Sequence, residues 1–192
     1  MVDIVSLWLP ILLSAVFVFV ASSILHMALP YHKSDFKKLP EEDGVLDALG
    51  KFSLPAGDYM FPSTGGDMAQ MRSDAFKEKM RKGPMGIMTV FPPVPEGKNP
   101  FGMGPQLTQW FFYCALISIF AAYVAGRALG PGAEYLQVHR FAAVAAFLGY
   151  AMADWQRSIW YKQPWSTTLK NTFDGLIYGL LTGGTFGWLW PS

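Results

Sequence analysis

Residues 4–25 read IVSLWLPILLSAVFVFVASSIL, and no Asp, Glu, Lys or Arg occurs between Asp3 and Lys33. A helix that crosses a bilayer needs about 20 mostly apolar residues at about 1.5 Å of rise each. The stretch is longer than the apolar core of a typical signal peptide, and residues 1–3 carry no positive charge. We therefore expect residues 1–29 to form a first transmembrane helix.

Three further apolar stretches lie in the second half of the chain. Residues 107–125 read LTQWFFYCALISIFAAYVA, and two more stretches of similar length follow. We expect helices at about 106–128, 138–160 and 170–190, which would make residues 106–192 a three-helix transmembrane bundle. The sequence thus predicts an all-α membrane protein with four transmembrane helices and a long, mostly irregular loop on the cytoplasmic face between the first two.

The composition narrows the class of protein. Hydrophobic residues make up 52% of the chain and charged residues 15%, against about 25% charged in an ordinary soluble domain. The net charge of +1 argues against a nucleic-acid partner. A single cysteine, Cys114, excludes a disulfide framework within the chain and a thiolate zinc cluster.

The distribution of positive charge predicts the orientation. Lys33, Lys37 and Lys38 follow the first apolar stretch closely, where a positive charge favours the cytoplasmic side most strongly. We expect both termini outside, and membrane lipids as the surroundings of the helices.

The loop 30–105 differs in composition from the rest of the chain. It contains ten Lys/Arg, ten Asp/Glu and ten of the 14 Pro, which predicts a membrane-associated polar segment with short helices over 40–49 and 73–83. Its phenylalanines argue against a flexible linker. Its methionine pairs could bind Cu(I), although a pliable apolar contact surface is the preferred interpretation.

Glycines recur at every fourth position of the last apolar stretch, at Gly175, Gly179, Gly183 and Gly187. Residues at this spacing share one helix face, and glycines there let a second backbone approach closely. The pattern predicts a tight helix–helix contact. Its partner is another helix of the chain or, alternatively, a second subunit.

Three charged residues are expected inside the membrane, at Asp154, Arg157 and Asp174. The rise per residue puts them at similar depth on neighbouring helices, and buried charges in lipid are usually paired. We expect one intramembrane charge cluster. It would act as an interhelical clamp or, alternatively, in an ion or proton step.

The sequence shows no motif for catalysis or for cofactor binding. The predicted topology puts His26 and His32 on the inner side and His139 on the outer side, so the two faces cannot share one haem. A phosphate-binding loop, a zinc-protease helix and a serine elbow are missing. We expect no enzyme activity, no catalytic residue, no cofactor and no metal.

Two stretches carry a resemblance to a known family. Residues 120–132, FAAYVAGRALGPG, and 158–191, SIWYKQPWSTTLKNTFDGLIYGLLTGGTFGWLWP, resemble a family of uncharacterised small four-helix bacterial membrane proteins, and residues 26–43, HMALPYHKSDFKKLPEED, resemble them too. The resemblance implies the bacterial inner membrane and implies no activity or site residue.

Two functions fit these features. The first is a non-catalytic accessory or scaffold subunit of a larger membrane assembly, with an energy-converting assembly as one candidate. The alternative is a small homo-oligomeric transporter or channel with its charged layer near the inner membrane face. The partners are accordingly other membrane subunits or further copies of the chain.

Overall fold

The computed structural model describes all residues from 1 to 192 and divides them into two compact units. Unit 1 consists of Met1–Phe36 together with Gly102–Ser192, and unit 2 is Lys37–Phe101. The segment from residue 30 to 36, which we expected to be part of the polar loop, thus belongs to unit 1.

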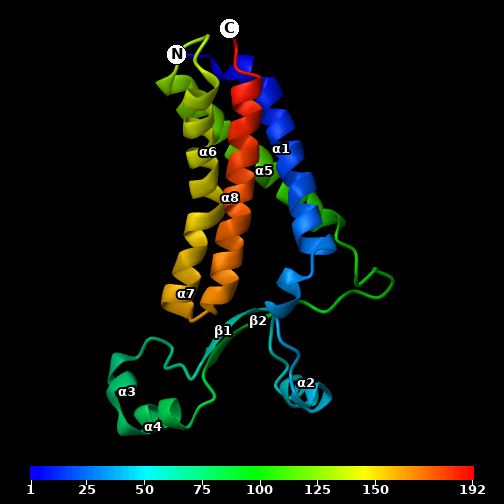
Figure 1. Ribbon diagram of the computed structural model, residues 1–192. Coiled ribbons are helices and arrows are strands. Elements are labelled where there is room, and N and C mark those ends of the chain that lie inside the picture. Colours follow the sequence, from blue (N-terminus) through cyan, green and yellow to red (C-terminus); the bar gives the residue numbers. More distant parts are fainter. The chain divides into compact units, whose positions relative to one another are not determined.

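Unit 1 is a bundle of long helices with both chain ends at the same end of the bundle (Figure 1). Its α-helices are α1 (Trp8–Ser23), α5 (Gly104–Ala128), α6 (Tyr135–Ala151), α7 (Trp155–Tyr161) and α8 (Trp165–Trp188). A 3₁₀ turn (Ile4–Leu7) precedes α1, and a π-helical turn (Ile24–Ala28) follows it. A further 3₁₀ turn (Met152–Asp154) links α6 to α7. The helix expected over 138–160 is therefore interrupted.

Two helices of unit 1 are long and apolar enough to cross a membrane. They are Ile4–Ala28 and Gly104–Ala128, each of 25 residues. The other two long helices, α6 and α8, do not meet the same measure of length and hydropathy. α6 has only 17 residues, and α8 carries polar residues in its first half.

Most buried residues of the bundle have small side chains, with Leu7, Val138, Tyr178 and Phe186 among the larger exceptions, whereas many large apolar side chains lie outside. Fully buried positions include Ala15, Ser118, Ala121, Ala142 and Ala146. Exposed positions on the same helices include Phe17, Phe120, Phe141, Val144 and Leu180. Interhelical hydrogen bonds supplement this packing, such as the 3.0 Å bond from the Ser14 hydroxyl to the Ser118 hydroxyl.

The four-residue glycine repeat of α8 faces α6 of the same chain. A Cβ atom added at Gly183 would lie 2.7 Å from the His139 carbonyl oxygen, and one at Gly179 would lie 2.9 Å from that of Ala143. Gly175 and Gly187 have equally close neighbours on α6. Of the two partners that the sequence left open, the structure gives the one within the chain.

Unit 2 contains short elements, namely α2 (Glu42–Gly50), β1 (Gly57–Phe61), α3 (Met68–Arg72), α4 (Asp74–Lys82) and β2 (Gly86–Val90). The predicted helix over 73–83 is confirmed, with the Ser73 hydroxyl accepting from the Phe76 amide at its start. The two strands pair antiparallel, with Tyr59 opposite Met88, and form one small sheet in a fold that is otherwise helical.

The strands form although Pro-rich stretches flank them, because every proline of the region lies outside the paired positions. β1 has a single half-buried residue, whereas half-buried and exposed residues alternate along β2. Because apolar Ile87 is one of the exposed residues of β2, the sequence shows no clear two-residue hydrophobic period.

The close contact between α6 and α8 predicts opposite outcomes for two adjacent glycines. Gly183→Ala should lower the thermal midpoint of the purified protein in detergent, because its methyl group would press on the His139 carbonyl oxygen at 2.7 Å. Gly184→Ala should leave the midpoint unchanged or raise it, since the nearest atom there is the Tyr135 hydroxyl at 3.6 Å and alanine favours helix. Equal midpoints for the two variants would contradict this packing.

Candidate functional site

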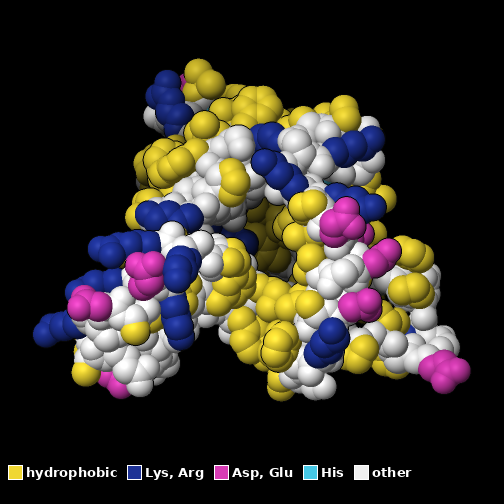
Figure 2. All heavy atoms as spheres, turned by 90° about the horizontal axis from the view of Figure 1, so that it is seen from below, with side chains coloured by type: hydrophobic (Ala, Val, Ile, Leu, Met, Phe, Trp, Pro, Cys, Tyr) yellow, Lys and Arg dark blue, Asp and Glu magenta, His cyan; other side chains and the backbone are white.

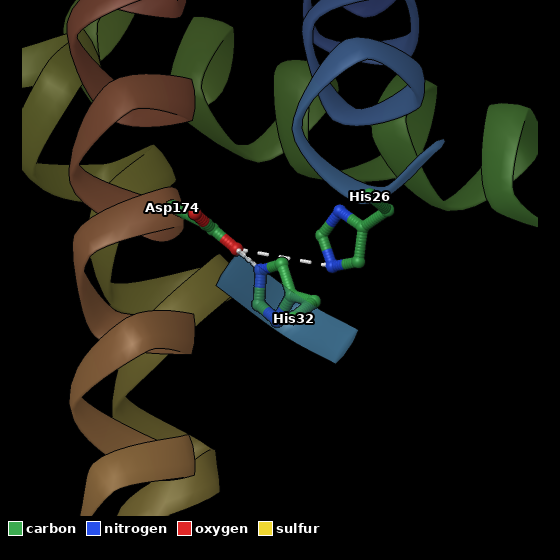
Figure 3. Close-up of side chains that lie close together, drawn as sticks. All are labelled: His26, His32 and Asp174. Atoms are coloured by element: carbon green, nitrogen blue, oxygen red, sulfur yellow. Dashed lines mark hydrogen bonds and ion pairs between the residues drawn. The ribbon is translucent and has the colours of Figure 1, made fainter. Parts of the chain in front are cut away.

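Asp174 of α8 is the centre of a polar cluster in unit 1, at the end of the bundle away from the termini. Its carboxylate side chain is only 3% exposed. The Tyr31 hydroxyl donates a hydrogen bond to its Oδ1 atom, and His32 Nε2 lies 2.8 Å from its Oδ2 atom. His26 Nε2 is 3.8 Å from the same Oδ2 atom, so both imidazoles converge on one carboxylate oxygen (Figure 3).

A second carboxylate supports the cluster from the other side of His32. Asp35 Oδ2 lies 2.6 Å from His32 Nδ1, and Asp35 Oδ1 accepts from Lys170 Nζ at 2.7 Å. Burial raises the pKa of Asp35, but the hydrogen bonds and charges of Lys170 and His32 together hold it below its usual range. Burial, followed by the hydrogen bond to Asp174, raises the pKa of Tyr31.

The local sequence brings these groups to α8. The π-helical turn that ends at Ala28 is followed by Pro30, which cannot continue a helix, and the 3₁₀ turn Tyr31–Ser34 then lies against α8. Lys170 fixes this turn, because its Nζ also donates to the Tyr31 carbonyl oxygen at 2.6 Å.

The two histidines lie face to face. Their ring centroids are 4.2 Å apart and the rings are inclined by 10°. His26 comes from the π-helical turn, a distortion often found at functional sites, and its Nδ1 lies 3.1 Å from the Ser22 carbonyl oxygen. That bond leaves Nε2 of His26 directed at Asp174 (Figure 3).

A groove of about 710 Å³ begins at this cluster and extends between α1, α5, α6 and α8. His26, Asp154, Asn171 and Asp174 are among the residues that line it. Its lining also includes a series of aromatic side chains with successive ring contacts, Trp110, Tyr113, Tyr150 and Tyr178.

Tyr178 is the unusual member of this aromatic lining. Its side chain is buried, and its hydroxyl has no hydrogen-bond partner within the chain. Leaving such a hydroxyl unpaired costs about 1–3 kcal/mol. The packing around Tyr178 therefore leaves one polar atom of the interior unsatisfied.

The cluster has the composition of a metal site rather than that of a nucleophilic one. His26, His32 and Asp174 each offer a ligand atom, and these atoms lie within 4.8 Å of one another. The sequence led us to expect no metal ligand in this chain, because it gave no sign that residues 26 and 32 meet α8.

The expected cluster of Asp154, Arg157 and Asp174 does not form. Arg157 is exposed and makes no ion pair, and Asp154 accepts instead from Asn171 Nδ2 at 2.8 Å. Ser158 pairs with Thr168 and Ala151 packs on Gly175, so Arg157 and Asp174 lie at different heights along the two helices. The rise per residue could not show this, because it fixes neither the offset between two helices nor the direction in which a side chain leaves its helix.

Sequence reasoning missed Tyr31, Asp35 and Lys170 as members of the cluster. The available signal was the run of polar residues from Tyr31 to Asp35 directly after a proline at the end of an apolar helix. Only the fold shows that this run turns back onto α8.

Comparison with known proteins found no match for this chain among protein-family models, curated proteins or solved structures.

The contrast between Lys170 and Arg157 gives a direct test of the cluster. Lys170→Met should lower the free energy of unfolding by about 1.5–3 kcal/mol, because it removes charged hydrogen bonds to a buried carboxylate. Arg157→Met should change it by no more than about 0.5 kcal/mol, as expected for an exposed residue without a partner. Reversible denaturation in detergent measures both, and a larger effect at Arg157 would favour the cluster expected from the sequence.

Proposed function

We propose that the protein is an integral membrane protein in which four helices cross the bilayer. The observation that supports this is the distribution of side chains on α6 and α8, the two helices of lower hydropathy. Both expose large apolar residues, such as Phe141, Leu148, Leu176 and Leu180, and most of the residues that they bury are small. Lipid favours this arrangement, because helices associate there through close packing of small residues rather than through hydrophobic exclusion.

Helix length is consistent with this proposal. The 24 residues of α8 correspond to about 36 Å of rise, which exceeds the ~30 Å of hydrocarbon. α6 reaches a comparable length only together with α7, and the turn between them lies at the level of the polar groove.

We propose further that the protein is a non-catalytic accessory or scaffold subunit of a larger membrane assembly. Unit 2 supports this, because it exposes large apolar side chains that a free domain would bury. Phe52, Phe91 and Phe101 are 72%, 79% and 86% exposed. Hydrophobic side chains lie between charges of both signs in the space-filling view (Figure 2).

The partner that fits this surface is a protein. Residues 37–101 contain nine Lys/Arg and nine Asp/Glu, so unit 2 has no net charge and lacks the positive excess that attracts anionic lipids. Exposed aromatic and methionine side chains are enriched at the centres of protein interfaces.

The alternative, a homo-oligomeric transporter or channel, has less support from the bundle. The half of the bundle near the termini is filled by an apolar cluster that includes Leu7, Val138 and Phe186, all fully buried. The polar groove thus has no continuation towards that end within one chain.

The subunit proposal predicts a heteromeric complex. Native mass spectrometry after mild extraction should show the chain with a different membrane protein. The double variant Phe91→Ser and Phe101→Ser should lose that partner, whereas Lys79→Ser, which changes another exposed residue of unit 2, should retain it. A homo-oligomer would favour the transporter, and a monomer under these conditions would contradict both proposals.

The four-helix proposal also predicts the topology. An even number of crossings puts both termini on one side, and the lysines after α1 favour the outside for both in the bacterial inner membrane. A reporter that is active only outside the cytoplasm should be active when it is fused to either terminus. Termini on opposite sides would contradict four crossings, and two cytoplasmic termini would reverse the orientation.

A further inference from the structure

We propose that His26, His32 and Asp174 bind one divalent first-row transition-metal ion at the end of α1 and α8. The donor set is two imidazole nitrogens and one carboxylate oxygen, which suits ions such as Zn²⁺ or Fe²⁺. This inference goes beyond the proposed role as a subunit and does not depend on it.

Each ligand is oriented by a second group, as metal ligands in proteins usually are. His26 Nδ1 lies at the Ser22 carbonyl oxygen and His32 Nδ1 at the Asp35 carboxylate. The Tyr31 hydroxyl occupies Oδ1 of Asp174. The atoms that remain, two Nε2 nitrogens and Oδ2, are the three that converge.

The distances fit a shared ion with one adjustment. Two donors at about 2.0–2.1 Å from one ion lie about 2.8–3.4 Å apart when the angle between them is about 90–110°. His32 Nε2 and Asp174 Oδ2 are already 2.8 Å apart. His26 Nε2 is 3.8 Å from the same oxygen, so its ring must turn out of the stack with His32, which its 49% exposure allows.

The charge of the site favours a cation. Asp35 and Asp174 carry two negative charges, and Lys170 supplies one positive charge to Asp35. Asp174 has no Lys or Arg partner. Histidine binds a metal ion in its neutral form. With His26 and His32 in that form, the cluster carries one net negative charge at a largely buried carboxylate, which the bound cation stabilises.

The groove supplies the positions that three protein ligands leave open. A catalytic or exchangeable zinc ion typically has three protein ligands and a fourth position for water or another ligand. His26 and Asp174 both line the groove, so a ligand of the ion could enter from it.

Zn²⁺ binding to the full-length protein tests the proposal. The protein is purified in detergent without a polyhistidine tag, stripped with a chelator, and titrated with Zn²⁺ by calorimetry. We expect one bound ion per chain. His26→Ala should weaken binding at least tenfold, and this variant should fold, because His26 is half exposed and makes no bond shorter than 3.1 Å.

His139→Ala is the matched control. His139 is the only other histidine of the chain and lies on α6, outside the cluster. This variant should bind Zn²⁺ as the wild type does. Absence of binding by the wild type would overturn the proposal, and so would loss of binding in His139→Ala or full affinity in His26→Ala.

A second variant tests the supporting group rather than a ligand. Asp35→Asn keeps the shape of the side chain but removes the carboxylate at His32 Nδ1. Loss of such a partner typically lowers metal affinity 10–100-fold, and we expect a fall within that range. Visible spectra of the Co²⁺-loaded wild type and Asp35→Asn should differ, since the change alters the field of a ligand. Unchanged affinity and an unchanged spectrum would exclude His32 as a ligand.

Discussion

The close approach of α8 to α6 is the constraint on which the rest of unit 1 depends. Glycines at every fourth position let the two backbones meet at distances that no side chain permits. This contact fixes both the height and the rotation of α8. Successive residues of a helix are about 100° apart, so when Gly175 faces α6, Asp174 must face elsewhere. The structure directs it to the end of α1, where the turn Tyr31–Ser34 completes its surroundings.

The same rotation arranges the groove. Tyr178 lies four residues after Asp174 and therefore on the same face of α8. One face of the helix thus carries backbone packing and another carries polar groups. Glycines allow the close packing of α8 on α6 and so set the rotation of α8. This rotation turns Asp174 and Tyr178 towards the groove between α1, α5, α6 and α8. The groove therefore depends on the glycine contact.

The sequence alone was sufficient to predict those features of this chain that repeat along a helix. The glycine period and the two most apolar segments could be read directly, because each is a pattern in one dimension. The polar cluster could not, since it joins residues about 140 positions apart. The rise per residue predicted Arg157 beside Asp174, yet Arg157 is exposed and its neighbour Ser158 lies level with Thr168, nearer the start of α8. The strands of unit 2 were missed because apolar residues such as Met60 and Ile87 lie at exposed positions, which hides a two-residue period in the sequence.

The position of His26 bears on whether the cluster around Asp174 is only a structural clamp or also a binding site. A clamp at this end of the bundle is complete with Tyr31, His32, Asp35 and Lys170, which satisfy Asp174 and each other at hydrogen-bond distance. His26 adds little to it: its ring is half exposed and its Nε2 is 3.8 Å from Asp174, beyond a hydrogen bond. The bond of its Nδ1 to the Ser22 carbonyl oxygen and the stack on His32 hold the ring in this orientation. The Nε2 atom of His26, which the clamp leaves unused, is the atom that the proposed ion would engage.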